Sequence, residues 1–372
     1  MPRPIRAFIH TDALAHNLQR ARTAAGDAKV WAVVKANAYG HGIERAYEGL
    51  RGADGFALLD LQEAERIRAL GWRGPILLLE GAFEPRDLEL CSRLGIWHSV
   101  HGDAQIDMLA GHKTLQPHKV FVKINTGMQR LGFAPERVRA AYTRLQALPQ
   151  VDDVGVMTHF ATADTDTPGI AQAYDIFQRA TEGLSGERSI CNSAALLRHP
   201  EVAQNTDWVR PGICLYGSSP DFPANTIADW DLRPTMSLRS RLIAVQQLQP
   251  GDQVGYGASF TADRPMRIGI VACGYADGYP RIAGTGTPIL VDGHRCRTLG
   301  RVSMDMLAVD LTPETTALPA DFVPDLATTE ITLWGASAFG SVLPIDEVAA
   351  CANTLGYELM CALALRVPVE VV

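Results

Sequence analysis

The stretch KVWAVVKANAYGHG, residues 29–42, contains the first of eight short apolar runs that decide the fold. That run is VWAVV, residues 30–34, and a segment of helical polarity separates it from the next run. Alternation of this kind is typical of parallel sheets built from βα units. The other runs cover residues 55–59, 75–79, 96–100, 119–124, 154–159, 188–191 and 212–216.

Eight βα units predict a closed α/β barrel of the TIM type. An open doubly wound sheet is the alternative, although the sequence lacks the GxGxxG turn that usually follows the first strand of such a sheet. A segment rich in Pro, Asp and Asn at residues 217–235 interrupts the alternation. We expect a barrel domain over residues 1–230 and a β-rich domain over residues 231–372, to which the first few residues could add a strand. The strands expected there are residues 238–248, 266–273, 287–291, 304–310 and 330–333, with one helix over 344–355.

Composition limits the class of protein. Of 372 residues, 47% are hydrophobic and 20% are charged, which is typical of a globular chain, and the net charge of −7 makes nucleic acid an improbable partner. No apolar stretch approaches the ~20 residues of a membrane helix, and the first residues, MPRPIRAF, lack a signal core, so we expect a cytoplasmic protein. Seven cysteines without a CxxC pair argue against both a disulfide framework and a metal site.

The chemistry of a barrel of this type lies at the carboxyl ends of its strands. Lys35 directly follows the first apolar run, and burial there lowers the pKa of an amine and frees it as a nucleophile toward carbonyls; a lysine extending to solvent is the alternative reading. Such an amine suits an aldehyde cofactor such as pyridoxal phosphate (PLP), which also needs phosphate donors. Individually weak candidates for those donors are Asn192, Ser193, Gly212, Ile213 and Tyr357.

Nine segments of this chain resemble bacterial alanine racemase, and most of all the catabolic-type enzyme of proteobacteria. They occur in the family's order over essentially the whole chain: VVKANAYGHG (33–42), KINTGMQRLGF (123–133), MTHFATAD (157–164), CNSA (191–194), WVRPGICLYG (208–217), VGYGASF (254–260), GYADGYPR (274–281), VSMDM (302–306) and GYELMCALALRVP (356–368). The resemblance implies a PLP-binding barrel followed by a β-rich domain, in agreement with the periodicity.

The resemblance also implies how PLP is held. Lys35 would form the internal aldimine, and Tyr39 and Tyr357 would contact the phosphate. Arg210 would face the pyridine nitrogen, where a cation disfavours ring protonation and so biases the cofactor away from transamination. His159 would pack beside the ring and shape the hydrogen bonds of Arg210, whereas by itself this residue suggests a hydrogen-bonded core histidine.

Racemisation removes a proton from one face of the α-carbon and returns one to the other face, so it calls for two bases. The resemblance assigns Lys35 to the face that gives D-alanine and Tyr256 to the face of L-alanine. Tyr256 lies in the second domain, and in the family this tyrosine reaches the cofactor of the other subunit. A homodimer with shared active sites is therefore expected.

Further residues are assigned to the substrate by the same resemblance. Arg130 would hold the carboxylate of alanine and the phenolic oxygen of the cofactor, and Lys123 would carry a carbamate that orients this arginine. Met304 and Asp305 would line the substrate entrance from the second domain.

The implied reaction is interconversion of L-alanine and D-alanine, which supplies D-alanine for peptidoglycan, serves alanine catabolism, or does both. A broad-specificity amino-acid racemase is the main alternative. A decarboxylase on the same barrel would place an acidic group at the pyridine nitrogen, and a PLP carrier without turnover would end near the eighth strand.

Overall fold

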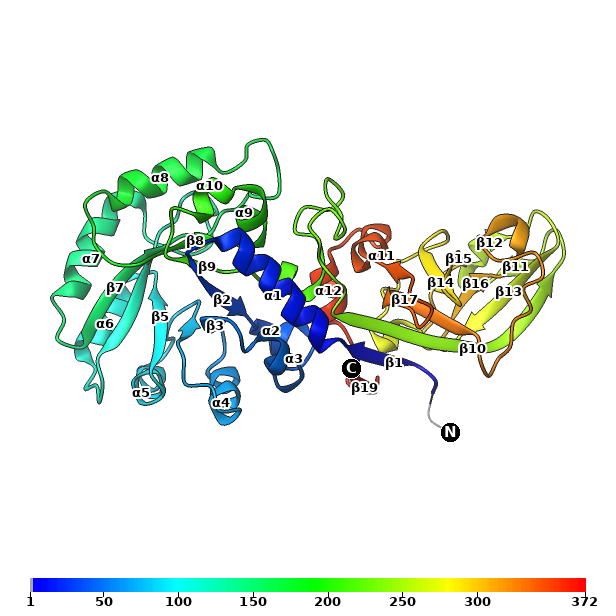
Figure 1. The fold of residues 1–372 in the computed structure, drawn as a ribbon, viewed down its shortest axis with the longest axis horizontal. Coiled ribbons are helices and arrows are strands. Elements are labelled where there is room, and N and C mark those ends of the chain that lie inside the picture. The colour runs from blue at the N-terminus through cyan, green and yellow to red at the C-terminus, as the bar shows by residue number, and fades with distance from the viewer. Residues whose placement is uncertain (1–2) are drawn as a thin grey trace.

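The computed structural model describes residues 3–372 and shows a barrel and a strand-rich part placed end to end (Figure 1). The barrel is closed, and its eight parallel strands follow the order of the chain, so the alternative of an open sheet is wrong. The strands are β2 (Lys29–Val33), β3 (Gly55–Leu58), β4 (Ile76–Leu78), β5 (Ile96–Val100), β6 (His118–Lys123), β7 (Val151–Met157), β8 (Arg188–Cys191) and β9 (Trp208–Val209).

Helices follow the barrel strands and cover the outside of the barrel. Local signals start several of them: the Asp60 carboxylate accepts a hydrogen bond from the Gln62 N–H at 2.8 Å, and Pro85 occupies the first turn of its helix. The helices are α1 (Thr11–Ala25), α2 (Lys35–Tyr39), α3 (Ile43–Leu50), α4 (Leu61–Ala69), α5 (Pro85–Leu94), α6 (Asp103–Gly111), α7 (Val138–Gln146), α8 (Ala171–Thr181), α9 (Ser193–Arg198) and α10 (Pro200–Ala203).

The eighth barrel strand lies earlier in the chain than the sequence predicted. Residues 212–216 were expected to form it, but residues 213–216 are a buried 3-10 helix, and the strand is β9, which ends just before Arg210. A short apolar run cannot be distinguished from a buried helical turn by periodicity alone. In addition, Pro211 lacks the N–H that a ladder of strands requires. Arg210 therefore follows the eighth strand instead of preceding it.

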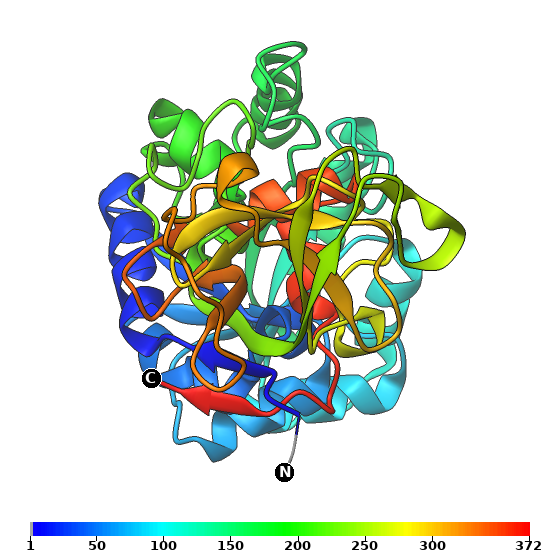
Figure 2. The same ribbon diagram turned by 90° about the vertical axis from the view of Figure 1, so that its right-hand side faces the viewer.

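The strand-rich part is a nine-stranded sheet that includes both ends of the described chain. β1 (Arg6–Ile9) pairs with β10 and with β19, so the first and last strands of the described chain lie side by side (Figures 1 and 2). The strands expected at 287–291 and 304–310 start later, as β14 and β16. β15 was not predicted, because its charged residues obscure the apolar pattern of its buried face. The sheet order is β18 (Val342–Leu343), β17 (Glu330–Ala336), β14 (Pro288–Val291), β15 (His294–Leu299), β16 (Leu307–Asp310), β13 (Met266–Val271), β10 (Met236–Leu248), β1 and β19 (Val369–Val371), with β11 (Gln253–Val254) and β12 (Phe260–Thr261) as a separate pair.

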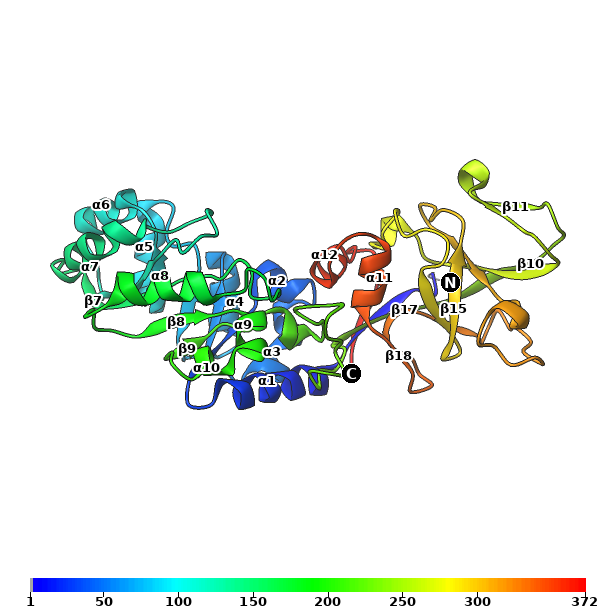
Figure 3. The same ribbon diagram turned by 90° about the horizontal axis from the view of Figure 1, so that it is seen from above.

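Two short helices lie between the barrel and the sheet: α11 (Ile345–Cys351) and α12 (Gly356–Cys361) (Figure 3). α12 contacts α2 at the carboxyl end of the first barrel strand. The second part of the molecule thus closes over the end of the barrel where chemistry is expected. Within residues 3–372, no helix is both long enough and apolar enough to cross a membrane.

Candidate active site

A cavity of about 1090 Å³ opens at the carboxyl ends of the barrel strands and continues beneath α11 and α12. It collects most of the residues that the sequence indicated. Those lining it are Lys35, Tyr39, Lys123, Arg130, His159, Asn192, Ser193, Arg210, Gly212, Ile213 and Tyr357. Such a pocket, formed at a barrel end by a few charged groups on apolar walls, is the usual form of a ligand site.

The residues after Lys35 form a left-handed turn. Ala36, Asn37, Ala38 and Tyr39 have φ values of 54°, 55°, 55° and 50°, although none of them is glycine. This conformation costs roughly 1–2 kcal/mol per residue. Gly40 ends the turn at φ 81°, where a Cβ would collide with the Met360 carbonyl of α12. The turn is therefore held between the barrel and α12.

Four cationic side chains face the cavity. Lys35, Lys123, Arg130 and Arg210 all act on His159, whose pKa lies well below its ordinary value because of burial first and these cations second. Burial also lowers the pKa of Lys35, and the charge of Arg130 lowers it further. This part of the cavity therefore suits an anionic ligand, and it favours the neutral amine at Lys35.

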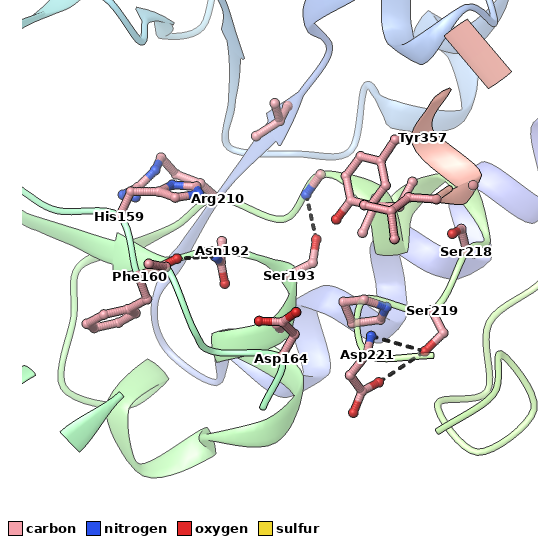
Figure 4. A pocket seen from close by; sticks show the side chains of 18 of the residues that line it. His159, Phe160, Asp164, Asn192, Ser193, Arg210, Ser218, Ser219, Asp221 and Tyr357 are labelled. Carbon is pink, nitrogen blue, oxygen red and sulfur yellow. Dashed lines mark hydrogen bonds between the residues drawn. The ribbon is translucent and has the colours of Figure 1, made fainter. Parts of the chain in front are cut away.

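Arg210 is buried without a carboxylate within 4 Å among the described residues. Its guanidinium donates to the Ser189 Oγ at 2.7 Å and to the Thr158 carbonyl, and burial lowers its pKa to about 10. Figure 4 shows His159 beside it. The guanidinium is thus held by neutral oxygens and retains its charge near neutral pH.

Lys123 lines the cavity but is largely buried, and its Nζ donates to the Leu79 carbonyl at 3.2 Å. Burial, followed by the charges of Arg210 and Arg130, lowers its pKa to about 8. A substantial fraction of this amine is therefore neutral in mildly alkaline solution.

Asn125 organises the loop that leads to Arg130. Its Oδ1 accepts from the N–H groups of Gly127 and Gln129 at 3.2 and 3.1 Å, and its Nδ2 donates to Gln129 Oε1 at 2.8 Å. An aspartate at this position could accept the hydrogen bonds from Gly127 and Gln129, but it has no N–H group to donate to the Gln129 Oε1.

The opposite end of the cavity is a cradle of hydroxyl groups, and the carboxylates of Asp164, Asp221 and Asp346 also line the cavity (Figure 4). The Ser193 Oγ accepts from the Gly212 N–H at 2.9 Å, and a Cβ at Gly212 would lie 2.5 Å from the Tyr39 Oη. Asn192 caps α9 and donates to the Phe160 carbonyl at 3.2 Å, so its amide is already engaged. Tyr357 extends over this end from α12, with its ring centroid 5.9 Å from that of Tyr39.

Three residues indicated by the sequence lie outside this cavity. Tyr256 and Met304 are exposed on the strand-rich part, with 72% and 53% of their surface accessible. Asp305 accepts from Arg366 at 2.6 Å. The Tyr275 N–H donates to the Ser303 carbonyl at 3.0 Å, which places the segments GYADGYPR and VSMDM side by side. Within a single chain, these residues do not reach Lys35.

Comparisons with known proteins agree with this architecture. The family model "Alanine racemase, N-terminal domain" matches residues 9–220, and the model "Alanine racemase, C-terminal domain" matches residues 235–371. The chain belongs to the alanine racemase family. A curated alanine racemase of Acidovorax sp. (strain JS42) is 69% identical over the full length of both chains, and one of Variovorax paradoxus (strain S110) is 66% identical over 99% of this chain and 98% of that protein.

Solved structures of the family superimpose closely on this chain. The biosynthetic alanine racemase from Pseudomonas aeruginosa gives a TM-score of 0.91 at 42% identity, covering 100% of this chain and 99% of that one. The alanine racemase from Acinetobacter baumannii gives 0.90 at 36% identity, with both chains covered completely.

Several residues that support this family member's cavity were not found from sequence. Ser189 and Thr158 hold Arg210, and Glu63 holds the turn after Lys35. Ser189 and Thr158 are small polar residues within the apolar runs 188–191 and 154–159, and only the closure of the barrel brings them beside the arginine. Glu63 lies on a helix that reads as an ordinary amphipathic element, so its sequence carries no signal of this contact.

Proposed function

We propose that this enzyme interconverts L-alanine and D-alanine with PLP attached to Lys35. The observation that carries the proposal is the cavity itself, where a partly buried amine of lowered pKa lies with three further cations and Glu80 and faces a cradle of hydroxyl groups. The curated homologues named alanine racemase support the reaction.

The residues present fit PLP. Ser193, Tyr39 and Tyr357 supply hydroxyl groups at the cradle, and the absent Cβ of Gly212 leaves room there for a phosphate. The cations balance the charges of the cofactor and of a substrate carboxylate, and Asn192 and Ile213 complete the wall. When bound, PLP supplies an electron sink that makes the α-proton of an attached amino acid acidic.

The chain's own residues then perform the proton transfers. With PLP and alanine bound, Lys35 as a neutral amine would take or return the α-proton on the face of D-alanine. Tyr256 does the same on the face of L-alanine. Arg130 binds the carboxylate. Ser189 and Thr158 hold Arg210 in place. A cation facing the ring nitrogen, in place of a carboxylate, would disfavour protonation of that nitrogen.

The position of Tyr256 requires a second copy of the chain in this proposal. Tyr256, Met304 and Asp305 lie on an exposed face, away from the cavity of their own chain. A homodimer would bring this face over the partner's cavity, where His159 and the cations would stabilise the tyrosinate form. Each active site would then contain residues from both subunits.

Mixing two inactive variants tests the function and the shared site together. Lys35→Ala and Tyr256→Phe are each expected to lose activity as homodimers. After mixing and subunit exchange, half of the dimers contain both chains, and one of their two sites is intact, so activity should return to about a quarter of the unmodified level. Racemisation is followed by α-proton exchange in deuterated water. No recovery despite demonstrated exchange of subunits would contradict the shared site.

Three further assignments belong to this proposal. Lys123, as a neutral amine, would add carbon dioxide and release a proton, and the resulting carbamate would pair with Arg130. The seven cysteines are free, which suits the reducing cytoplasm, where D-alanine is made for peptidoglycan or alanine is degraded. We place the domain division between residues 230 and 231.

A further inference from the structure

The left-handed turn after Lys35 joins the two ends of the candidate cofactor site. Lys35 begins this turn, and Tyr39, whose hydroxyl lies above Gly212 in the cradle, ends it. PLP is a rigid molecule whose reactive carbon and phosphate have a fixed separation. The conformation of the five residues Lys35–Tyr39 therefore decides whether the distance between the amine and the cradle matches the length of PLP.

Asn37 is of a residue type that adopts the left-handed form readily, but Ala36, Ala38 and Tyr39 are not. Two of its members are alanines, which lack the side-chain hydrogen bonds that allow asparagine to adopt this conformation. Within the turn, the Gly40 N–H donates to the Ala36 carbonyl at 3.0 Å. The remaining support must come from other elements.

α4 supplies a further part of that support, besides the contact with α12. The Glu63 Oε1 accepts a hydrogen bond from the Asn37 N–H at 2.6 Å, and the Arg66 Nη2 donates to the Asn37 Oδ1 at 2.8 Å. Arg66 is fixed in turn by Glu44, which accepts from its Nε at 2.7 Å. α4 thus forms hydrogen bonds with both the backbone and the side chain of Asn37, at the middle of the turn.

Burial of the Glu63 carboxyl group costs free energy that simple packing of the helix would not require. It is buried at 8% exposure, its Oε2 has no hydrogen-bond partner, and no lysine or arginine within 4 Å pairs with it among the described residues. Burial raises the pKa of its carboxyl, and the bond from Asn37 opposes that shift. An apolar residue at this position of the helix would avoid the desolvation cost.

We infer that Glu63 is a positioning residue, which holds the turn in its left-handed form and thereby fixes Lys35 relative to the phosphate cradle. The inference rests on the proposed function, since it concerns the lysine that carries PLP. Glu63 touches neither cofactor nor substrate in this role and acts only through the backbone of Asn37.

Four variants of the full-length enzyme test this role through the rate of PLP release, measured by absorbance of the bound cofactor, together with kcat and KM for alanine. Glu63→Ala should release PLP about tenfold faster and lower kcat with little change in KM, because a hydrogen bond to a charged group is lost. Glu63→Gln keeps an acceptor oxygen and should stay within about twofold of the unmodified enzyme. Glu65→Ala, an exposed position of the same helix, is the matched control and should change neither rate.

The fourth variant separates positioning from general stability. Ala36 is exposed, so Ala36→Gly removes little contact but makes the left-handed conformation easy to adopt. Added to Glu63→Ala, it should restore part of the PLP retention. If Glu63→Ala does not fold, Glu63→Asp with and without Ala36→Gly gives the same comparison.

The results distinguish this role from the proposed function. Normal PLP retention and kcat in Glu63→Ala, a Gln variant as impaired as the Ala variant, or no recovery with Ala36→Gly would each overturn the positioning role. An unmodified protein that takes up no PLP would instead overturn the proposed function.

Discussion

The two regions that carry the candidate catalytic residues are built in opposite ways. The barrel end encloses Lys35 and three other cations in a cavity, and fixed oxygens hold Arg210 there. The face that carries Tyr256 and Met304 is open to solvent. A tyrosine acts as a base only where nearby charges lower its pKa. Under the proposed function, the first region is therefore complete within one chain, whereas the second would depend on a partner chain.

The sharpest test of this contrast is Tyr256→Phe. Proton abstraction from L-alanine should fall by roughly 10²–10⁴-fold, because a general base is lost, whereas abstraction from D-alanine should fall much less. Exchange of the α-proton in deuterated water, measured from each enantiomer separately over short times, gives both values. Tyr174→Phe, on the outer helix α8, is the control and should change neither rate.

Equal losses from the two enantiomers would contradict the division of labour between Lys35 and Tyr256. In that case one base would serve both faces, and the exposed face would require another explanation.

A smaller effect is expected at the cradle, which belongs wholly to the enclosed region. In Gly212→Ala the new Cβ would lie 2.5 Å from the Tyr39 Oη and displace it. Overpacking of this size costs about 1–3 kcal/mol, so PLP affinity should drop by about tenfold or more. Titration of the apoenzyme with PLP measures it. Gly111→Ala, where a Cβ meets nothing within 4 Å, should leave the affinity unchanged, and equal affinities for both variants would disprove the cradle.

The sequence predicted the strands and cavity residues of the barrel better than the residues that hold them in place, such as Ser189, Thr158 and Glu63. Apolar runs between helical segments are set by burial, so seven barrel strands were placed within a few residues, and Lys35 was assigned to a strand end. The eighth run was misplaced because Gly212 to Tyr216 have the polarity of a buried strand but form a helical turn. The terminal strands β1 and β19 pair across the whole chain, which no local pattern reveals.

The exposed region shows a different limit of prediction. Residues such as Tyr256 were found only through resemblance to a family, since an aromatic residue in a loop flanked by glycines has no distinctive periodicity. Glu63 was missed for the opposite reason: its helix is regular, and its contact with Asn37 depends on a left-handed turn that Ala36, Ala38 and Tyr39 do not favour. Local preference and tertiary constraint conflict there, as they often do beside functional groups.

The smallest expected effect concerns stability in acid. Burial lowers the pKa of His98 to about 3 and that of His118 to about 4; each is lowered further by a neighbouring histidine, and the two rings lie 3.2 Å apart between Nε2 and Nδ1. The unfolded chain binds these protons near pH 6.5, so their neutral forms stabilise the barrel above that pH, and the stabilisation is lost as the pH falls toward 4. The loss should be of order 1–2 kcal/mol per histidine near pH 5.

In the strand-rich part, His294 is exposed, and the one histidine of lowered pKa is His10, whose Nε2 lies 2.8 Å from the Ser237 Oγ of β10, whereas β13 and β14 contain no histidine. Hydrogen exchange between pH 7 and pH 5, corrected for intrinsic rates, should therefore show β5 and β6 losing protection more steeply than β13 and β14. His118→Gln should flatten the pH response of the barrel, whereas His294→Gln should have no effect. Equal losses of protection in the two parts would mean that acid opens the molecule as a unit, and the enclosed region would then owe its acid sensitivity to its contacts with the sheet.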